Sequence, residues 1–397
     1  MSSADSIHTF QNKNSEYSKN FFRILTDDFP EEKYKPKEKD QDRSSVHYGQ
    51  RKLFLSEVEF LTNVCCQVPK EKLFKKIVII YAGAAPGIHI DFLNQLFPFM
   101  YFVLVDPAKM AVKTSEKIRI HQEYFTDETA QSLKKEFQHD LILFISDIRR
   151  FGPGAKLTDS EIEEEIVEDM RNQKNWFKIL NPFRALLKFR LPYVENRTNA
   201  QRFLEYLDGD VYFQIWPPNS SSETRLYVKE NAGLKEYDCI KYENQLYRFN
   251  NNERVMCYEH EYLVDGLDHC YDCRAELYVF ENYLENFSKI EALNRKVKIT
   301  KLKVEDYVKQ LNHHLEADKK FLRFSYNKQE YQIKFTEIKY GKKVEDLFID
   351  ENLAKNKFNK WEKRTFHFDH QKTKIPKNDM CLLKKRLNST VIKRLNK

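Results

Sequence analysis

The segment Ile77–Leu93, which reads IVIIYAGAAPGIHIDFL, constrains the fold of this chain more than any other. Its first five residues, Ile77–Tyr81, are apolar and mostly β-branched, which is typical of a short parallel strand buried on both faces. Gly83, Pro86 and Gly87 then interrupt the run. Beyond them, apolar residues recur at helical spacing: Ile88, Phe92 and Leu96. The segment therefore predicts the strand, turn and helix of an α/β unit.

The glycine turn predicts a ligand site. Glycine has no Cβ, so a bound molecule can lie against the main chain, where the free N–H groups of the next helix point at it. A second apolar run, Tyr101–Val105, ends in Asp106, 23 residues after Gly83. A carboxylate at that distance can accept both ribose hydroxyls of a nucleoside-type cofactor. A third run, Leu141–Ile145, leads to Asp147.

The turn itself narrows the choice of cofactor. Dinucleotides and S-adenosylmethionine both fit the spacing, but the turn reads G-A-A-P-G and lacks the G-x-G-x-x-G fingerprint of dinucleotide sites. This favours S-adenosylmethionine as the cofactor. The alternative is that the glycines only relieve steric crowding, and the acidic strand end at the expected distance argues against it.

Composition indicates a globular protein with an uneven charge distribution. Its 397 residues are 41% hydrophobic and 14% aromatic, enough for a substantial core. The net charge is +7, yet the 27 residues from Gln371 onward hold nine Lys or Arg and one Asp. The tail predicts contact with a polyanion such as RNA, although a solvated tail without a ligand would have the same composition.

Cysteine usage and the start of the chain predict a soluble cytoplasmic protein. Seven cysteines without an apolar segment near the start argue against a secreted disulfide framework. No run approaches the roughly 20 apolar residues that a membrane span needs. We therefore expect no membrane partner.

The chain divides into three expected parts. Residues 1–45 are polar, with Pro30 and Pro36, and predict a mobile arm, in which Tyr34 is one of the aromatic exceptions. Residues 46–296 are expected to form the α/β domain. Residues 297–397 differ in sequence pattern from the preceding part and predict an appended α+β region. This region is expected to contain a helix in VEDYVKQLNHHLEADKKFL, a strand in YQIKFTEIKY and the basic tail.

Within the α/β domain, helices and strands alternate, which predicts a mainly parallel central sheet. Apolar residues at helical spacing predict a helix from about Arg51: Phe54, Val58, Leu61 and Cys65. Residues 127–138 predict another, and Thr158–Glu161 is a capping box that starts a third. Leu186–Arg190 is the expected strand that carries Lys188. Four further short strands are expected at an antiparallel edge: Val211–Trp216, Arg225–Lys229, Tyr237–Tyr242 and Gln245–Phe249.

Four charged residues on elements that converge near the glycine turn are candidates for chemistry: Lys52, Asp147, Lys188 and Glu223. A lysine within a strand is more often an edge residue that reaches solvent. Together with a methyl donor, however, the set fits methyl transfer to a ribose 2′-hydroxyl, which requires a base close to a very weak acid. Lys188 can be that base when neutral, a form that burial and Lys52 favour and the two carboxylates oppose.

Five blocks of the sequence resemble the poxvirus poly(A) polymerase regulatory subunit family of cap-specific mRNA (nucleoside-2′-O-)methyltransferases: HYGQRKLFLSEVEFL, YAGAAPGIHI, LFISDIRR, ILNPFRALLKFRLPY and PPNSSSETRL. The resemblance extends from about Tyr34 to Leu284. It implies a Rossmann-like S-adenosylmethionine-dependent methyltransferase encoded by a large DNA virus, acting in the host cytoplasm or the virion. It also implies that the same four charged residues form a catalytic Lys-Asp-Lys-Glu tetrad.

The resemblance further implies two sets of binding residues. The expected S-adenosylmethionine contacts are Tyr81, Gly83, Pro86, Gly87, Asp106, Phe125 and Asp147. An arginine of the family is replaced here by Ala108, with Lys109 adjacent. The expected contacts to the 7-methylguanine of the cap are Tyr34, Tyr193, Glu195 and Glu243. Aromatic rings stack on this cationic base and carboxylates accept its N–H groups, although isolated tyrosines are more often packing residues.

The family also implies capped mRNA as a partner and a possible role as a processivity subunit of a poly(A) polymerase. Two alternatives remain open: a catalytically silent RNA-binding or polymerase-stimulating subunit, and a 2′-O-methyltransferase of another RNA such as rRNA. The intact tetrad argues against the first alternative. Tyr193 and Glu195 argue against the second, because rRNA enzymes need no cap slot.

Cys257, His260, Cys270 and Cys273 form a C-x₂-H…C-x₂-C pattern outside the resemblance. These residue types are a plausible tetrahedral set for a structural zinc ion, with His269 as a further possible ligand. The alternative is that Cys270 and Cys273 are core residues of a strand.

Overall fold

The computed structural model describes residues 18, 20–35, 49–150, 157–195, 201–218, 221–262, 269–294, 299–315, 321–326 and 329–334. The predicted basic tail from Gln371 lies outside the described residues. Within the part that is described, no helix has both the length and the apolar character needed to cross a bilayer.

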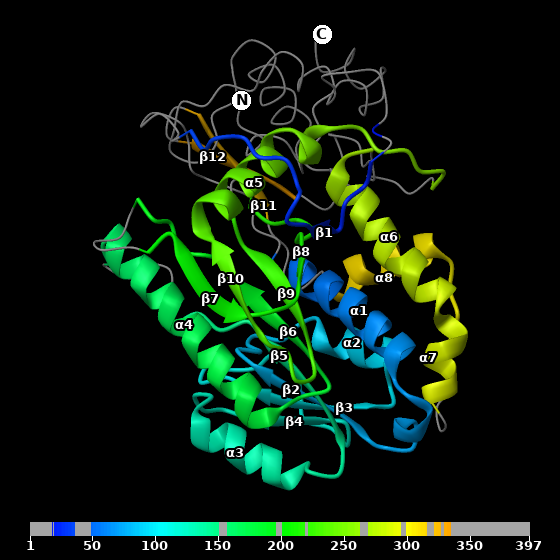
Figure 1. Cartoon of the computed structure of the whole chain (residues 1–397). Coiled ribbons are helices and arrows are strands. Elements are labelled where there is room, and N and C mark those ends of the chain that lie inside the picture. The colour runs from blue at the N-terminus through cyan, green and yellow to red at the C-terminus, as the bar shows by residue number, and fades with distance from the viewer. Residues whose placement is uncertain are drawn as a thin grey trace.

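An eight-stranded sheet forms the centre of the molecule (Figure 1). Its spatial order is β1-β8-β9-β6-β5-β2-β3-β4. The strands are β1 (Ile24–Leu25), β2 (Ile77–Ala82), β3 (Met100–Val105), β4 (Ile118–His121), β5 (Leu141–Ser146), β6 (Arg184–Phe189), β8 (Asp210–Tyr212) and β9 (Thr224–Lys229). Strands β2 to β6 pair in parallel, while β9, β8 and β1 add an antiparallel edge. The expected α/β class with a mainly parallel sheet is confirmed.

The chain order places a ligand crevice in this sheet. From β2 the chain moves outward through β3 to β4, and then returns to the other side of β2 as β5 and β6. The winding direction therefore reverses between β2 and β5. Ligands of open α/β sheets bind at such a switch point, beside the carboxyl ends of the strands. Both strands are buried along their whole length, which explains their uninterrupted apolar sequences.

Helices cover both faces of the sheet (Figure 1). One face carries α3 (Asp127–Glu136) and α4 (Asp159–Leu180). The other carries α1 (Gly49–Gln67) and α2 (Ile90–Leu96), with α6 (Tyr271–Glu285), α7 (Phe287–Leu293) and α8 (Val304–His314) beside them. Two short 3₁₀ helices, η2 (Lys70–Lys72) and η3 (Glu253–Val255), lie in connections. The predicted capping box at the start of α4 is present, since Thr158 and Glu161 each accept the other's backbone N–H.

Helix α1 is buried almost all round. The predicted inward residues Phe54, Val58 and Leu61 are fully buried, but α6 and α7 also cover the side that faces away from the sheet. Charged residues on that side consequently have buried partners, as in the ion pair of Arg51 with Glu276. The helix is therefore a central element of the core.

Two of the expected strands are wrong. Strand β10 (Leu234–Asp238), which pairs with β7 (Phe203–Leu207), ends where helix α5 (Cys239–Asn251) begins. Helix α5 includes most of the segment that was expected to form the strands Tyr237–Tyr242 and Gln245–Phe249. Asp238 caps it by accepting the N–H groups of Ile240 and Lys241. Its buried positions Tyr242, Leu246 and Phe249 follow helical spacing, and this periodicity decided over the β propensity of the aromatic residues.

The expectation of a mobile N-terminal arm is also wrong for residues 20–35. Strand β1 pairs with β8, and the Arg23 guanidinium lies 2.6 Å from the Glu59 carboxylate in a buried ion pair. The Phe29 carbonyl accepts a hydrogen bond from Gln245 at 2.8 Å. Pro30, which excludes a long helix from this segment, does not prevent it from forming a sheet edge.

The start of the region that was expected to be appended packs into the same core. Helix α8 confirms the predicted helix, with Tyr307 stacked on Phe280 at 5.5 Å and Val308 and Leu311 buried. Strands β11 (Phe321–Tyr326) and β12 (Gln329–Lys334) form a hairpin, whose second strand overlaps the predicted one. The division of the chain at residue 297 remains a prediction.

Candidate functional site

The Gly83 turn lies where the carboxyl ends of β2 and β5 meet. Gly83 has φ +80°, and a Cβ on it would lie 2.9 Å from the backbone carbon of Asp147 and the backbone nitrogen of Ile148. The Asp147 N–H donates to the Ala82 carbonyl at 3.0 Å. The immediate reason for this glycine is thus its left-handed backbone and the close approach of the chain after β5. Gly87, at φ +67°, is the second left-handed position of the turn.

Asp106 follows β3 and holds the turn in place. Its carboxylate accepts the N–H groups of Ala85 at 3.1 Å and Ala108 at 2.8 Å. A carboxylate has about four acceptor positions, so two of them are left for ribose hydroxyls. The neighbouring Pro86 and Lys109 are exposed. The position of Asp106 is compatible with the role expected from the sequence.

Two of the expected cofactor residues point into the core. Tyr81 is fully buried and donates its hydroxyl to Glu57 at 2.7 Å. Phe125, between β4 and α3, packs against Trp176 and Phe144. A cofactor could contact Tyr81 only through its main chain.

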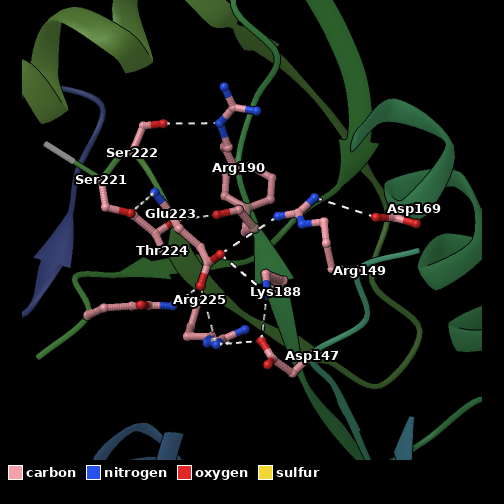
Figure 2. A network of polar contacts seen from close by, with 12 residues as sticks. Asp147, Arg149, Asp169, Lys188, Arg190, Ser221, Ser222, Glu223, Thr224 and Arg225 are labelled. Carbon is pink, nitrogen blue, oxygen red and sulfur yellow. Dashed lines mark hydrogen bonds and ion pairs between the residues drawn. The ribbon is translucent and has the colours of Figure 1, made fainter. Parts of the chain in front are cut away.

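The structure brings the four candidate catalytic residues together at the same sheet edge. The Lys188 Nζ lies 3.1 Å from Asp147 Oδ1 and 3.3 Å from Glu223 Oε2, as Figure 2 shows. The Lys52 Nζ donates to the other Glu223 oxygen at 2.8 Å. Lys188 therefore lies between two carboxylates, and Glu223 lies between two ammonium groups.

Sheet topology explains why these distant residues converge. Asp147 directly follows β5, and Lys188 lies near the carboxyl end of the neighbouring parallel strand β6. Strand β9 runs antiparallel to β6, with Lys188 opposite Arg225. Glu223 directly precedes β9 and therefore lies at the same sheet edge as Lys188. Lys52 comes from the first turns of α1.

Sequence reasoning missed three polar residues of this site. Arg225 is buried, with its guanidinium 2.7 Å from Asp147 Oδ1 and 3.5 Å from Glu223 Oε1. Gln214 donates to Glu223 at 3.0 Å. The Arg149 guanidinium lies 3.7 Å from the Glu223 carboxylate (Figure 2). Arg225 could have been found, since residues two apart in a strand share a face and Glu223 was already a candidate.

The cluster holds more positive than negative charge. Burial lowers the pKa of Lys52, and the nearby charges of Arg225 and Lys188 lower it further, against the opposing effect of Glu223. Burial alone would raise the pKa of Glu223, but Lys188, Lys52 and Arg225 outweigh it and hold this pKa well below its ordinary value. The pKa of Asp147 is lowered by the same balance of burial against Lys188 and Arg225. Both carboxylates are therefore ionised at neutral pH.

Tyr193 is held in a fixed orientation close to this cluster. Its N–H donates to Glu163 at 2.9 Å, and its hydroxyl lies 2.7 Å from the Ser222 hydroxyl. The Arg190 guanidinium lies 4.1 Å from the ring centroid and covers one face, while also donating to Ser222 and Glu163. These contacts determine which face of Tyr193 a second ring can use.

The remaining candidate cap residues lie on or beside α5. The Tyr34 N–H donates to Asn244 at 2.9 Å, and its half-exposed ring packs edge-on against Tyr247. Next to Asn244 is Glu243. Burial, followed by the charge of Glu195, raises the pKa of Glu243 to about 7. Glu195 and Glu243 are thus close enough to influence each other, although they are far apart in sequence.

The zinc prediction is not supported. Over the described ranges, no group of three or more His, Cys, Asp or Glu side chains could hold a metal ion. Cys270 is the N-cap of α6, where its Sγ accepts the N–H of Cys273 at 3.4 Å. Both cysteines are buried at the start of a helix, so the alternative of a strand is also wrong.

Comparisons with known proteins relate this chain to one protein family and to several viral proteins. A family described as "Poly A polymerase regulatory subunit" matches residues 16–294. A cap-specific mRNA (nucleoside-2′-O-)-methyltransferase of Myxoma virus (strain Lausanne) is 26% identical over 62% of this chain and 73% of its own length. A protein of the same name from Fowlpox virus (strain NVSL) is 27% identical over 56% of this chain and 73% of its own.

A solved structure of bluetongue virus VP4, described as a multifunctional RNA-capping production-line, has a TM-score of 0.32 and 10% identity, covering 68% of this chain and 44% of that one. The family match extends over most of the α/β fold and includes all four residues of the charged cluster. This chain belongs to the poly(A) polymerase regulatory subunit family.

Proposed function

We propose that this chain transfers a methyl group from S-adenosylmethionine to the ribose 2′-hydroxyl of the first transcribed nucleotide of capped mRNA. The observation that carries the proposal is the convergence of Lys52, Asp147, Lys188 and Glu223 beside the Gly83 turn. The names of the Myxoma and Fowlpox virus relatives support it. We place the activity in the host cytoplasm or the virion.

The cofactor would lie against the Gly83 turn, with Asp106 accepting its ribose hydroxyls through the oxygen positions that Ala85 and Ala108 leave open. S-adenosylmethionine supplies the methyl group as a sulfonium electrophile. The other expected contacts of this site, Gly87 and Asp147, border the same turn.

Lys188 is the proposed base, which removes the proton of the 2′-hydroxyl at its Nζ. Asp147 and Glu223 hold that nitrogen from two sides and so orient its lone pair. Lys52 and Arg225 bind the same two carboxylates and so help to hold them in position around Lys188.

Cap specificity is proposed to come from Tyr193 and its neighbours. Arg190 covers one face of the Tyr193 ring, so 7-methylguanine would stack on the other, with Tyr34 as the second aromatic residue. Glu195 and Glu243 would accept its N1–H and N2–H₂ groups. Because the pKa of Glu243 is about 7, its carboxylate becomes available as the pH rises through neutrality.

The family description favours a second function, as regulatory subunit of a poly(A) polymerase. Its partners would be the catalytic subunit of that polymerase and RNA. This role is compatible with methyl transfer, because the viral relatives named above are described as methyltransferases.

Transfer of tritiated methyl groups tests the main proposal. Capped RNA with an unmethylated first nucleotide is expected to be labelled at its 2′-oxygen, while uncapped RNA of the same sequence stays unlabelled. Equal labelling of uncapped, internally structured RNA would instead favour an rRNA-type enzyme. No labelling of any RNA, with RNA binding retained, would favour the catalytically silent alternative.

Replacing Tyr193 by Ala is expected to weaken binding of 7-methyl-GTP by about 1–3 kcal/mol, the usual contribution of base–aromatic stacking. Tyr193→Phe should retain most of the affinity, losing only the orientation that the hydroxyl contact with Ser222 provides. Fluorescence titration with 7-methyl-GTP and GTP measures both effects. Equal affinity of the wild type for the two nucleotides would contradict the cap slot.

A further inference from the structure

A continuous chain of buried polar groups lies directly beneath the Gly83 turn. It consists of Gln50 and Glu57 on α1, Tyr81 at the end of β2, and His89, the residue that precedes α2. His89 and Tyr81 are 0% exposed and Glu57 is 1% exposed. Polar groups so deeply buried are costly unless every donor meets an acceptor. The hydrogen-bond partners therefore reveal where the protons lie.

The backbone of Ile88 fixes the first proton. Its N–H donates to Gln50 Oε1 at 2.9 Å, so the amide of Gln50 must present its oxygen here and not its NH₂ group. His89 Nδ1 lies 2.8 Å from the same oxygen. An amide oxygen only accepts, and His89 Nδ1 therefore carries a hydrogen.

The other ring nitrogen then requires a second proton. His89 Nε2 lies 2.9 and 3.1 Å from the two Glu57 oxygens. With Nδ1 protonated, this contact is a hydrogen bond only if a proton lies between the imidazole and the carboxyl group, on either side. Tyr81 donates to the same carboxyl at 2.7 Å, and burial and Glu57 hold the pKa of Tyr81 well above its ordinary value, so it remains a donor. The pair thus binds one shared proton and has no net charge.

This chain connects two parts of the proposed active site. Lys52 lies on α1 between Gln50 and Glu57, the two residues of this helix that belong to the hydrogen-bonded chain. The proposed cofactor turn is the Gly83–His89 segment. Tyr81, two residues before it, and His89, its last residue, hold its two ends by their hydrogen bonds. Through Glu57 the turn is bonded directly to the helix that carries Lys52.

We propose that Glu57 and His89 are positioning residues for S-adenosylmethionine, which hold the cofactor turn against α1 through the hydrogen bonds that Glu57 makes with His89 and Tyr81. This inference rests on the proposed function, since it assumes that the turn binds the cofactor. Neither side chain can touch the cofactor itself, because both side chains are fully buried. Their effect is on the position of the turn and not on proton transfer to the substrate.

The chemistry of the chain allows a matched pair of variants. In Glu57→Gln the amide oxygen accepts the Tyr81 hydroxyl, and the NH₂ group donates to the Nε2 of a neutral His89, so every group keeps a partner without the shared proton. Glu57→Ala leaves both the Tyr81 hydroxyl and His89 Nε2 buried without a partner. Glu59→Gln is the control, since Glu59 is a buried carboxylate on the same helix that pairs with Arg23, away from the turn.

Calorimetric titration with S-adenosylmethionine is the test. Glu57→Ala is expected to lower the cofactor affinity by about tenfold or more. Glu57→Gln and Glu59→Gln should stay within about threefold of the wild type. Affinity for 7-methyl-GTP should be unchanged in all three, because its site lies elsewhere. Equal cofactor affinity of the wild type and Glu57→Ala would overturn the positioning role.

Nitrogen NMR of the histidine rings provides a readout that does not depend on the function. The wild type is expected to show His89 with a protonated Nδ1 and a proton shared at Nε2, and Glu57→Gln to show a proton on Nδ1 alone. An unprotonated Nδ1 in the wild type would overturn the shared proton, even if Glu57→Ala fails to fold. Wild-type protein that binds no S-adenosylmethionine would contradict the proposed function, whereas the NMR result would still stand by itself.

Discussion

Replacing Lys188 by Met is expected to reduce methyl transfer by about 10²- to 10⁴-fold, the usual contribution of a positioned base. Methionine keeps most of the apolar stem of the side chain, so β6 should pack as before. The nitrogen that lies between Asp147 and Glu223 is removed, and no other group takes its position. Single-turnover labelling of capped RNA measures the effect on the chemical step.

Cofactor binding distinguishes a base from a ligand contact. Lys188→Met should bind S-adenosylmethionine about as tightly as the wild type, because the base acts on the acceptor. Asp106→Ala should instead lower the affinity for S-adenosylmethionine, since it removes the carboxylate that is the proposed ribose acceptor and that holds Ala85 and Ala108. If Lys188→Met loses cofactor affinity or keeps most of its turnover, the role assigned to Lys188 is wrong.

The largest loss of stability is expected for Asp272→Ala. Asp272 lies at the start of α6 and is fully buried, where it accepts hydrogen bonds from Arg254 at 3.0 and 3.1 Å and from the Trp216 N–H at 2.8 Å. Its removal leaves the Arg254 guanidinium as an uncompensated buried charge. Such a change typically costs about 3–5 kcal/mol in the free energy of unfolding, which urea denaturation can measure.

A half-exposed ion pair on the same helix provides the control. Glu281 and Arg274 lie 2.9 Å apart, and each side chain is 22% exposed. Glu281→Ala should cost no more than about 1 kcal/mol, because solvent screens the pair. Equal destabilisation by the two variants would show that burial of the Arg254 ion pair has no special effect.

Asp272→Ala should also impair the active site while the protein is still folded. Besides Asp272, Arg254 binds the Pro217 carbonyl at 2.8 Å, and Trp216 adopts a left-handed φ of 59° that non-glycine residues rarely hold without support. This anchored segment leads to Glu223. We therefore expect the turnover of the folded fraction to fall, measured well below the unfolding midpoint.

Several features of the protein were determined by the sequence alone because they depend on neighbouring residues. A strand that is buried on both faces consists of an unbroken run of apolar residues, such as Ile77–Tyr81. The start of α4 can be recognised from the capping box that the four residues Thr158–Glu161 form. The carboxyl ends of parallel strands meet at one edge, so the sequence by itself places Asp147 and Lys188 near the Gly83 turn.

The same local reasoning failed where burial decided between two possibilities. Tyr237–Phe249 is rich in aromatic residues, which favours strands, but the segment has one face to bury against the core and Asp238 to cap a helix. Residues 20–35 look polar, yet Arg23 is neutralised by Glu59 and lies inside the molecule. The burial of Arg23 is not visible without the partner segment that carries Glu59.

Only the tertiary structure decided how the site is completed. The pairing of β6 with β9 places Arg225 opposite Lys188, and this register is a property of two strands and not of either sequence. The steric reason for Gly83 is the passage of the chain after Asp147, and the shared proton of Glu57 and His89 depends on the backbone of Ile88. Such contacts join residues distant in sequence, so local periodicity and composition do not predict them.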